Sequence, residues 1–280
     1  MMNISLIAVD WGTTSFRLWA LDANHRVIET VDGPQGMSTL LPHEFRLVLE
    51  ENLVALKIGP TVPVVVCGMA GAAQGWFEAP YLSAPTNLTS IGTQVIKVPG
   101  LDRDVYILPG IKQIHPAQVM RGEETQIAGL LQSDPHFEGT VCLPGTHTKW
   151  ARVADGCLAE FTTTMTGEQF ALLSQSSVLK HSMAEQGWDP KSFGAAVKET
   201  LGAPQTIATR LFGLRAEMLI GDLSSAMATS RLSGMLIGIE LAATRAYWQD
   251  TSVGLIGASA LCAKYQMALE AEGVDVTVLD

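Results

Sequence analysis

The chain has 280 residues, more than the roughly 100–200 of a typical domain, so two domains are expected. Hydrophobic residues make up 47% of the sequence and charged residues 16%, which argues against a disordered chain. The formal net charge of −10, without any run of Lys and Arg, argues against a nucleic-acid-binding surface.

The cysteines and the termini point to a reducing compartment. The four cysteines are scattered without a C-x-x-C pair, which fits the cytosol and predicts no zinc site. The first residues lack the positive region and cleavage site of a signal peptide. The longest apolar helix candidate, residues 232–243, carries Glu240 and is too short to span a bilayer. We therefore expect a soluble, cytoplasmic protein with no membrane partner.

The first third of the chain predicts three strands, a helix and a further strand. Strands are expected over residues 4–9, 16–21 and 26–31, the first as a continuous apolar run and the other two joined by an Asp-Ala-Asn turn. Apolar residues of segment 42–56 fall on one helical stripe. Residues 62–67 form another buried strand, which leads into a Gly-Met-Ala-Gly loop.

The middle of the chain contains an apparent repeat. Residues 81–110 are rich in Pro, Gly, Ser and Thr and predict loops with one strand at 105–108, before a helix that begins near Gly122. Residues 140–161 then repeat the plan of the N-terminus: strand, Gly-Thr turn, strand, tight turn, strand. A chance match is the alternative, but an internal repeat would set the whole architecture.

The remainder supports a duplication. Helices are expected over residues 167–246, followed by a strand at 252–256, a helix at 258–270 and a strand at 274–279. Two α/β halves that each open with a Gly-Thr hairpin indicate two domains facing a cleft. Ligands of open α/β sheets lie outside strand ends, so both turns are expected to face that cleft.

Asp10 stands at the end of the first strand, just before a turn of Gly12, Thr13, Thr14 and Ser15. The N–H groups and hydroxyls of such a turn form a nest for phosphate oxygens. A carboxylate beside a phosphate requires a cation between them, and Mg²⁺ binds one or two carboxylates together with substrate phosphates. Asp10 is therefore predicted on the metal side of a Mg²⁺–nucleotide site. The alternative is a carboxylate that caps its own turn.

The second turn offers a similar cradle. It contains Gly145, Thr146, His147 and Thr148, and the following Lys149 is expected to neutralise phosphate charge. The alternative is an ordinary hairpin with a solvated lysine. For His147, a structural role in hydrogen bonding is an equal alternative to a role in catalysis.

A third loop, Gly257, Ala258 and Ser259, follows a strand and opens a helix, which is typical of a nucleotide-contacting loop. It lacks the final glycine of a nucleophile elbow. The sequence contains neither a Walker A motif nor G-x-G-x-x-G, so P-loop and Rossmann interpretations lack their fingerprints.

Several segments are more specific than these turns, among them IAVDWGTTSFRLW, GMAG, VMRGEETQ, LPGTHTKW, LSGMLIGIE and GASALCAKYQMAL. Together they resemble the 2-dehydro-3-deoxygalactonokinase family over nearly the whole chain. That family belongs to the superfamily of sugar kinases, actin and large heat-shock chaperones (ASKHA). RGEETQ together with PGTHTKW is specific to the family, whereas DWGTT alone is typical of the superfamily.

The resemblance implies an α/β fold of two ribonuclease-H-like (actin-like ATPase) domains facing a nucleotide cleft. Residues 1–118 would carry the first hairpin and the substrate side, and residues 119–280 the second hairpin and the adenosine side. It implies ATP and Mg²⁺ as cofactors and phosphoryl transfer to the 6-hydroxyl of 2-dehydro-3-deoxy-D-galactonate, in galactonate catabolism. The sequence departs from the superfamily at Pro144, where many members carry Asp before the glycine, and the given sequence ends soon after its last expected strand, where the family usually adds a final helix.

Glu123 and Glu124, at the start of a predicted helix, are candidates for the general base. The superfamily's base often lies in the equivalent connecting helix. Adjacent helical residues point about 100° apart, so only one of them can face a substrate. The alternative is an acidic first turn that the helix dipole stabilises.

A sugar acid also requires partners for its own carboxylate and hydroxyls. Arginine binds carboxylates bidentately, and backbone N–H groups serve as well. The predicted substrate-binding residues are Arg17, Gly68, Met69, Ala70, Gly71, Trp76, Arg121, Glu168 and Arg215. For the arginines the alternative is a structural ion pair, for Trp76 core packing, and for Glu168 an ordinary helix N-terminal acid.

Two other functions remain open from the sequence. One is a kinase of another sugar or sugar acid; the other is a nucleotide-gated binding protein of the actin or chaperone type. Proteins of the latter type add subdomains, for which 280 residues leave no room. A homodimer is a reasonable expectation for the assembly.

Overall fold

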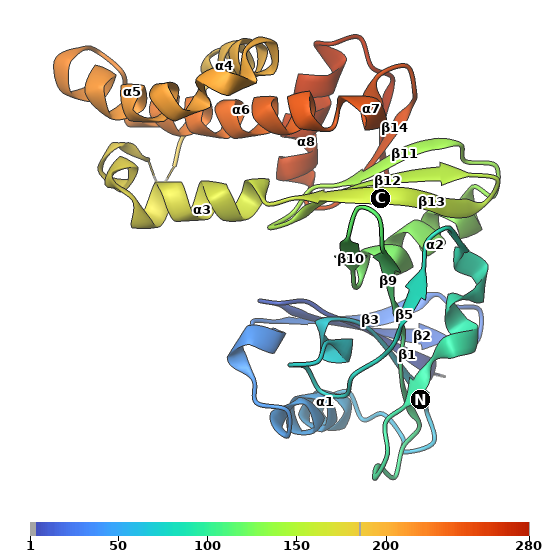
Figure 1. Cartoon of the computed structure of the whole chain (residues 1–280). Helices are drawn as coiled ribbons and strands as arrows, with labels where there is room; N and C mark the ends of the chain where they lie inside the picture. The colour runs from blue at the N-terminus through green and yellow to red at the C-terminus, as the bar shows by residue number, and fades with distance from the viewer. Residues whose placement is uncertain (1–3, 185, 280) are drawn as a thin grey trace. The chain divides into compact units, whose positions relative to one another are not determined.

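The structure is a computed structural model that describes residues 4–184 and 186–279 (Figure 1). Its contacts divide the chain into two compact units, residues 1–136 with 156–159, and residues 137–155 with 160–280. This division lies later than the predicted boundary between residues 118 and 119. The helix α2 (Glu123–Ser133) groups with the first unit because it packs against η3 (Leu88–Gln94) of that unit.

The first unit is built on a sheet with strand order β3-β2-β1-β4-β8-β7. β1, β2 and β3 are antiparallel, whereas β4 and β8 run parallel to β1. The strands are β1 (Ile4–Trp11), β2 (Phe16–Asp22), β3 (Val27–Gly33), β4 (Val64–Gly68), β7 (Ile96–Lys97) and β8 (Val105–Ile107). The helix α1 (Glu44–Ala55) packs its buried stripe into the same core.

Side-chain alternation along β1 explains why a carboxylate stands in an apolar strand. Val9 and Trp11 are buried in the core shared with α1, and successive residues of a strand point to opposite faces. Asp10, between them, therefore points to the other face of the sheet. Its partners across the sheet, Arg17 on β2 and Cys67 on β4, share that face.

The remaining elements of the first unit are short. They are β5 (Tyr81–Ser83), β6 (Thr86–Asn87), β9 (Gly110–Gln113), β10 (Gln118–Met120), η1 (Met37–Thr39) and η2 (Met69–Gly71). Of these, β5 and β6 lie in the region 81–110 that was predicted as mostly loop, because strands of two or three residues carry too little pattern to be recognised. β6 pairs with the first residues of β13, which cluster with this unit.

The second unit contains a sheet of the same plan. Its strands are β11 (Gly139–Leu143), β12 (Thr148–Ala154), β13 (Cys157–Thr164), β14 (Val253–Ile256) and β15 (Val276–Leu279). The order β13-β12-β11-β14-β15 reproduces β3-β2-β1-β4-β8, with the first three strands antiparallel and the last two parallel to the central one. The predicted duplication of two similar α/β halves is confirmed.

Helices form the rest of the second unit, where Figure 1 shows α3, α4, α5 and α6 gathered at one end. They are α3 (Thr166–Ser176), η4 (Val178–Ser182), α4 (Pro190–Gly202), η5 (Pro204–Thr206), α5 (Ile207–Ile220), α6 (Ser225–Ala243), α7 (Arg245–Trp248) and α8 (Ser259–Glu270). α6 packs closely on α4 because Gly234 and Gly238 face the α4 backbone; a Cβ at Gly238 would lie 2.7 Å from the Val197 carbonyl oxygen. The close helix packing predicted from these glycines is confirmed.

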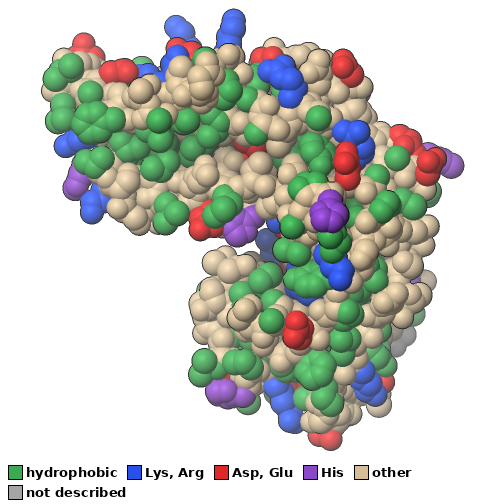
Figure 2. All heavy atoms as spheres, viewed as in Figure 1, with side chains coloured by type: hydrophobic (Ala, Val, Ile, Leu, Met, Phe, Trp, Pro, Cys, Tyr) green, Lys and Arg blue, Asp and Glu red, His purple; other side chains and the backbone are tan. Residues whose placement is uncertain are grey.

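Two surface properties bear on the partners of the chain. Within the part of the chain that the structure describes, no helix has the length and apolarity to cross a bilayer. Hydrophobic side chains gather over the helical end of the second unit (Figure 2), and Phe212, Leu219 and Ile220 on α5 are among the exposed ones.

Candidate functional site

The first group of predicted residues forms a polar row at the end of the first unit's parallel strands. Asp10 pairs with Arg17 on one side and with Cys67 on the other, and the Cys67 Sγ lies 4.0 Å from Asp10 Oδ1. The Arg17 Nε lies 3.9 Å from Asp32 Oδ1. Burial raises the pKa of Asp10; the charge of Arg17 opposes this rise, and the charge of Glu123 adds to it. The positive charge of Arg17 therefore does not fully offset the cost of burying the Asp10 carboxylate.

The two predicted acids of α2 have different surroundings. Glu124 is fully buried, and both of its carboxylate oxygens accept the Gly122 N–H, at 2.7 and 2.8 Å. Burial raises the pKa of Glu124 to about 7, with the charge of Glu123 as the next cause. Glu123 is only half-buried, and its Oε2 accepts the Arg121 N–H at 3.0 Å. Of the pair, Glu123 is the one whose charge acts on Asp10.

Two glycines allow the start of α2 to approach the strand ends. Gly68 has a φ of +86°, and a Cβ there would lie 2.6 Å from the Trp11 carbonyl oxygen and 3.1 Å from Asp10 Oδ1. Gly122 has a φ of +110°, and its Cβ would lie 3.3 Å from the Gly68 Cα. Both backbone conformations favour glycine, so these residues bring Glu123 and Asp10 into one neighbourhood.

The turn after β1 is held from one side. The Gly12 N–H donates to the Ser15 carbonyl at 2.8 Å, and the Met37 N–H donates to the Gly12 carbonyl at 3.0 Å. The side chains of Thr13 and Thr14 are exposed. The turn thus has a fixed backbone with two hydroxyls at the surface.

Met69 to Gly71 of the Gly-Met-Ala-Gly segment form η2, directly after β4. Two other predicted substrate residues, Arg121 and Trp76, have packed side chains. Arg121 is 8% exposed, donates from Nη2 to the Ala79 carbonyl at 2.8 Å, and stacks over the Tyr81 ring at 4.3 Å. Gly71 packs against the same guanidinium, since a Cβ there would lie 2.8 Å from Nη1. Trp76 stacks on Phe45 in the core cluster around Trp11.

In the second unit, the turn after β11 contacts the start of α3. The Glu168 N–H donates to the Thr146 carbonyl at 3.0 Å, and the Glu168 Oε2 lies 2.5 Å from the His147 Nε2. Gly167 leaves no room for a Cβ against the Gly145 carbonyl. His147 and Glu168, predicted for separate roles, form one pair.

The third predicted loop lies beside this turn. β14 runs parallel to β11, so the two strands end at the same edge of the sheet. A Cβ at Gly257 would lie 3.1 Å from the Pro144 carbonyl oxygen, and Ala258 and Ser259 are exposed at the start of α8. The structure therefore brings the second hairpin, the N-terminus of α3 and the N-terminus of α8 together.

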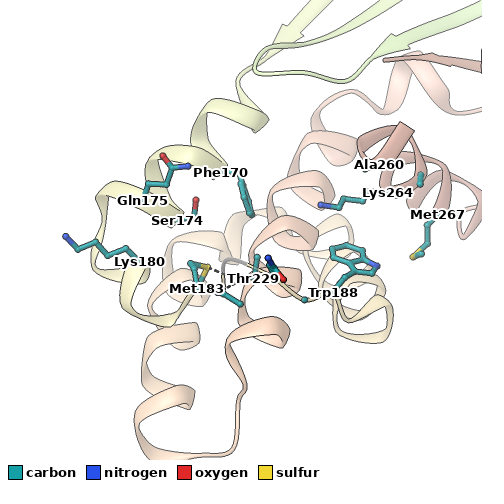
Figure 3. Close-up of a pocket in the computed structure, with 14 residues that line it drawn as sticks. Phe170, Ser174, Gln175, Lys180, Met183, Trp188, Thr229, Ala260, Lys264 and Met267 are labelled. Carbon is teal, nitrogen blue, oxygen red and sulfur yellow. Dashed lines mark hydrogen bonds between the residues drawn. The ribbon is translucent and has the colours of Figure 1, made fainter. Parts of the chain in front are cut away.

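A pocket of about 870 Å³ lies between α3, α8 and the segment before α4 (Figure 3). Phe170, Trp188, Ala260 and Lys264 are among its lining residues. The Lys264 Nζ lies 4.6 Å from the centroid of the Trp188 ring, and burial lowers the pKa of this lysine. No sequence pattern predicts this pocket; the local indication was the position of Ala260 directly after the predicted loop.

Three further predicted residues have distinct placements. The Thr148 side chain is buried and its hydroxyl lies 3.0 Å from the Tyr265 hydroxyl, so it faces the interior. Lys149 is 5% exposed on β12, opposite Leu143. Arg215 lies on α5, whose neighbours are α6, η4 and η5.

The family model and the curated relatives that match this chain agree on one family. The model of the 2-keto-3-deoxy-galactonokinase family matches residues 10–280. The chain belongs to this family. It is 39% identical over 280 residues to "Probable 2-dehydro-3-deoxygalactonokinase DgoK1" of Rhizobium meliloti (strain 1021), covering 98% of this chain and 91% of that protein. It is 35% identical over 281 residues to the 2-dehydro-3-deoxygalactonokinase of Escherichia coli (strain K12), covering 99% and 94%.

Solved structures agree with the galactonokinase assignment. A crystal structure of a Sinorhizobium meliloti protein described by the same enzyme name superposes with a TM-score of 0.91 at 38% identity, covering 98% of this chain and 91% of that one. The activator of 2-hydroxyisocaproyl-CoA dehydratase from Clostridium difficile, solved with bound ADPNP, has a TM-score of 0.50 at 12% identity, covering 98% and 88%. This second likeness shows the fold alone. The predicted fold, two ribonuclease-H-like domains of the actin-like ATPase class, is confirmed.

Proposed function

We propose that this protein is a 2-dehydro-3-deoxygalactonokinase that transfers a phosphoryl group from ATP to the 6-hydroxyl of 2-dehydro-3-deoxy-D-galactonate. The observation that carries the proposal is family membership, with 35–39% identity to two relatives of that name over nearly their full lengths. The geometry of each unit supplies groups that such a reaction needs. Phosphoryl transfer depends mainly on positioning and on charge neutralisation, which both units offer in different forms.

The second unit supplies the features of a nucleotide site. The turn of Gly145 to Thr148 meets the N-terminus of α3, and helix N-termini and backbone nests favour phosphate oxygens. The pocket next to Ala260 has the aromatic ring of Trp188 and a volume suited to a purine base. We assign the triphosphate to the turn, the adenine to the pocket, and the ribose that joins them to the loop of Gly257 to Ser259.

The first unit supplies the acidic groups. The charge of Glu123 adds to the cost of ionising the buried Asp10, and a hard cation would relieve that repulsion. Among the residues described, no three His, Cys, Asp or Glu form a metal cluster. That arrangement fits Mg²⁺, which binds one or two carboxylates and completes its shell with waters and phosphates. Bound Mg²⁺ neutralises charge on the transferring phosphates, and Asp10 is the residue we propose to hold it.

Glu123 is the better candidate for the general base. Both oxygens of Glu124 are held by the N–H of Gly122 in a fully buried position, so that side chain cannot reach a substrate without breaking these bonds. Glu123 is half-buried beside the Asp10 row. We propose that its carboxylate accepts the proton of the attacking hydroxyl.

Arg17 is the candidate for the carboxylate of the sugar acid. Its side chain is 50% exposed and lies on the Asp10 face of the sheet, whereas Arg121 is buried and its Nη2 donates to the Ala79 carbonyl. An exposed guanidinium can bind a carboxylate bidentately. The backbone of Gly68 to Gly71 remains a further proposed contact. The roles predicted for Trp76, Glu168, Arg215 and Lys149, and the homodimer, stay predictions.

A coupled assay of ADP release tests the function. The substrates are 2-keto-3-deoxy sugar acids that differ in the configuration of single hydroxyls, with free hexoses as controls. We expect turnover with the galactonate-derived acid well above that with its epimers, and none with hexoses. The position of the new phosphate is read by ³¹P–¹H NMR. ADP release that needs no acceptor would instead indicate a nucleotide-gated binding protein.

A further inference from the structure

A buried carboxylate lies beneath the second hairpin. Glu240, in the interior of α6, is 3% exposed. Its Oε1 accepts the Trp150 Nε1–H at 2.7 Å, and its Oε2 accepts the Tyr265 hydroxyl at 2.9 Å. The side chains of Thr164 and Thr166 also hydrogen-bond to it. This one carboxylate thus accepts hydrogen bonds from side chains at four positions of the chain.

The network extends to the hairpin itself. The Tyr265 hydroxyl lies 3.0 Å from the Thr148 Oγ1, so a continuous path runs from Glu240 through Tyr265 to the first residue of β12. Thr166 is the first residue of α3, and Tyr265 belongs to α8. The three elements that meet at the proposed nucleotide site are therefore tied to the same buried group.

The surroundings make this arrangement costly unless it is fully bonded. The neighbours of the network are apolar: Phe193, Val197, Ile237 and Leu241 belong to the same core cluster as Trp150 and Tyr265. Burial raises the pKa of Glu240, whereas the hydrogen bonds of the threonines, Trp150 and Tyr265 lower it. A satisfied polar network in a core fixes the relative placement of the elements it joins, because displacing any member leaves a buried group unpaired.

We propose that Glu240 is a positioning residue for nucleotide binding: through Tyr265, Thr148 and Thr166 it fixes the second hairpin and the N-termini of α3 and α8 in one arrangement. This inference rests on the assignment of the second unit to the nucleotide. Glu240 itself is buried, so it acts through these side chains and not by contact with the nucleotide. Its effect is on the affinity for ATP and ADP, and it leaves the affinity for the sugar acid unchanged.

The test removes single hydroxyl groups. Tyr265→Phe and Thr148→Val each cut the path while nearly preserving side-chain volume. We expect the Kd for ADP, measured by isothermal titration calorimetry, and the KM for ATP to rise about three- to tenfold, the scale of one lost hydrogen bond. The KM for the sugar acid is expected to stay within about twofold of the wild-type value.

Thr200→Val is the matched control. Thr200 is equally buried, and its hydroxyl donates to the Ala196 carbonyl at 2.7 Å within α4. It is expected to lower the Tm without altering either nucleotide constant. If Tyr265→Phe and Thr148→Val behave like this control, the network is only structural and the inference is overturned.

A conservative exchange supplies a rescue test. In Glu240→Gln the amide oxygen still accepts from Trp150, and the amide NH₂ donates to the Tyr265 hydroxyl, which then donates to Thr148. We expect this variant to retain most of the ADP affinity, whereas Glu240→Met, which offers no acceptor of comparable strength, loses it. Equal ADP affinity in the Gln and Met variants contradicts the proposal, and so does failure of the wild type to bind ADP. A wild type that binds ADP but phosphorylates no sugar acid overturns the proposed function alone.

Discussion

Glu124 gives a prediction whose sign follows from the structure. Burial raises the pKa of Glu124 from 4.5 to about 7, so the folded chain binds this proton more tightly than the unfolded chain. The stabilisation is present below the unfolded pKa and is lost as the pH rises through the folded one. A shift of one unit corresponds to 1.36 kcal/mol. Between pH 5 and pH 8 the free energy of unfolding should therefore fall by about 2 kcal/mol through this group.

The substitution Glu124→Gln isolates that contribution. Glutamine keeps an oxygen that accepts the Gly122 N–H and carries no titrating proton. Between pH 5 and pH 8 the free energy of unfolding of the wild type should therefore fall by about 2 kcal/mol more than that of Glu124→Gln. Guanidinium unfolding at pH 5 and pH 8, followed by circular dichroism, measures the difference. Subtracting the two proteins cancels the groups they share, including Asp10 and Glu240, whose pKa values are also raised by burial.

Glu51→Gln is the matched control, because Glu51 is an exposed glutamate on α1 of the same unit. Measured in parallel, it controls for the loss of one carboxylate at an exposed position of the same unit. If the wild type and Glu124→Gln lose stability in parallel between these pH values, the pH dependence assigned to Glu124 is refuted. In that case Glu124 does not change its charge state in the folded protein within this range.

Three further substitutions test the proposed site. Asp10→Asn should lower kcat about 100-fold, the scale of a lost charge-stabilising group, while circular dichroism shows an intact fold; wild-type turnover would reject the metal role. Glu123→Gln should lower kcat by about 100-fold or more, whereas Glu124→Gln should retain most of it; equal effects would place the base elsewhere. Trp188→Ala should raise the KM for ATP about tenfold, as for a lost base-stacking ring, and an unchanged KM would move the adenine out of this pocket.

Local pattern was sufficient for the first three strands of each half, for the parallel strands beside them, for most of the helices and for both hairpins, but not for the short strands β5, β6, β7, β9 and β10. The apolar run before Asp10 and the one before Pro144 each specify a central strand, and the Gly-Thr turns mark where it ends. The choice between Glu123 and Glu124 was not available from the sequence. It depends on the positive φ of Gly122 and on its contact with Gly68, which comes from a distant strand.

The features that the sequence did not reveal depend on tertiary packing. Glu240 was read only as a charge within an apolar helix, because its partners Trp150 and Tyr265 lie 90 and 25 residues away along the chain. The pocket at Trp188 and Lys264 likewise combines four separate segments of the chain, from α3, the stretch before α4, α6 and α8. Periodicity reports which face of an element is buried, but it does not report which buried side chains meet.

We propose that the two hairpins of the duplicated fold have different roles in one reaction. Asp10 pairs with Arg17 across the first hairpin, and the corresponding pair of the second is Leu143 with Lys149. The second unit thus keeps a cation at this position but replaces the carboxylate by a buried apolar residue. A site without the carboxylate repels phosphates less, whereas a site with it attracts a metal ion. This difference is the physical reason to assign phosphate binding to the second hairpin and Mg²⁺ to the first, and it predicts that Leu143→Asp weakens ATP binding more than Leu143→Asn.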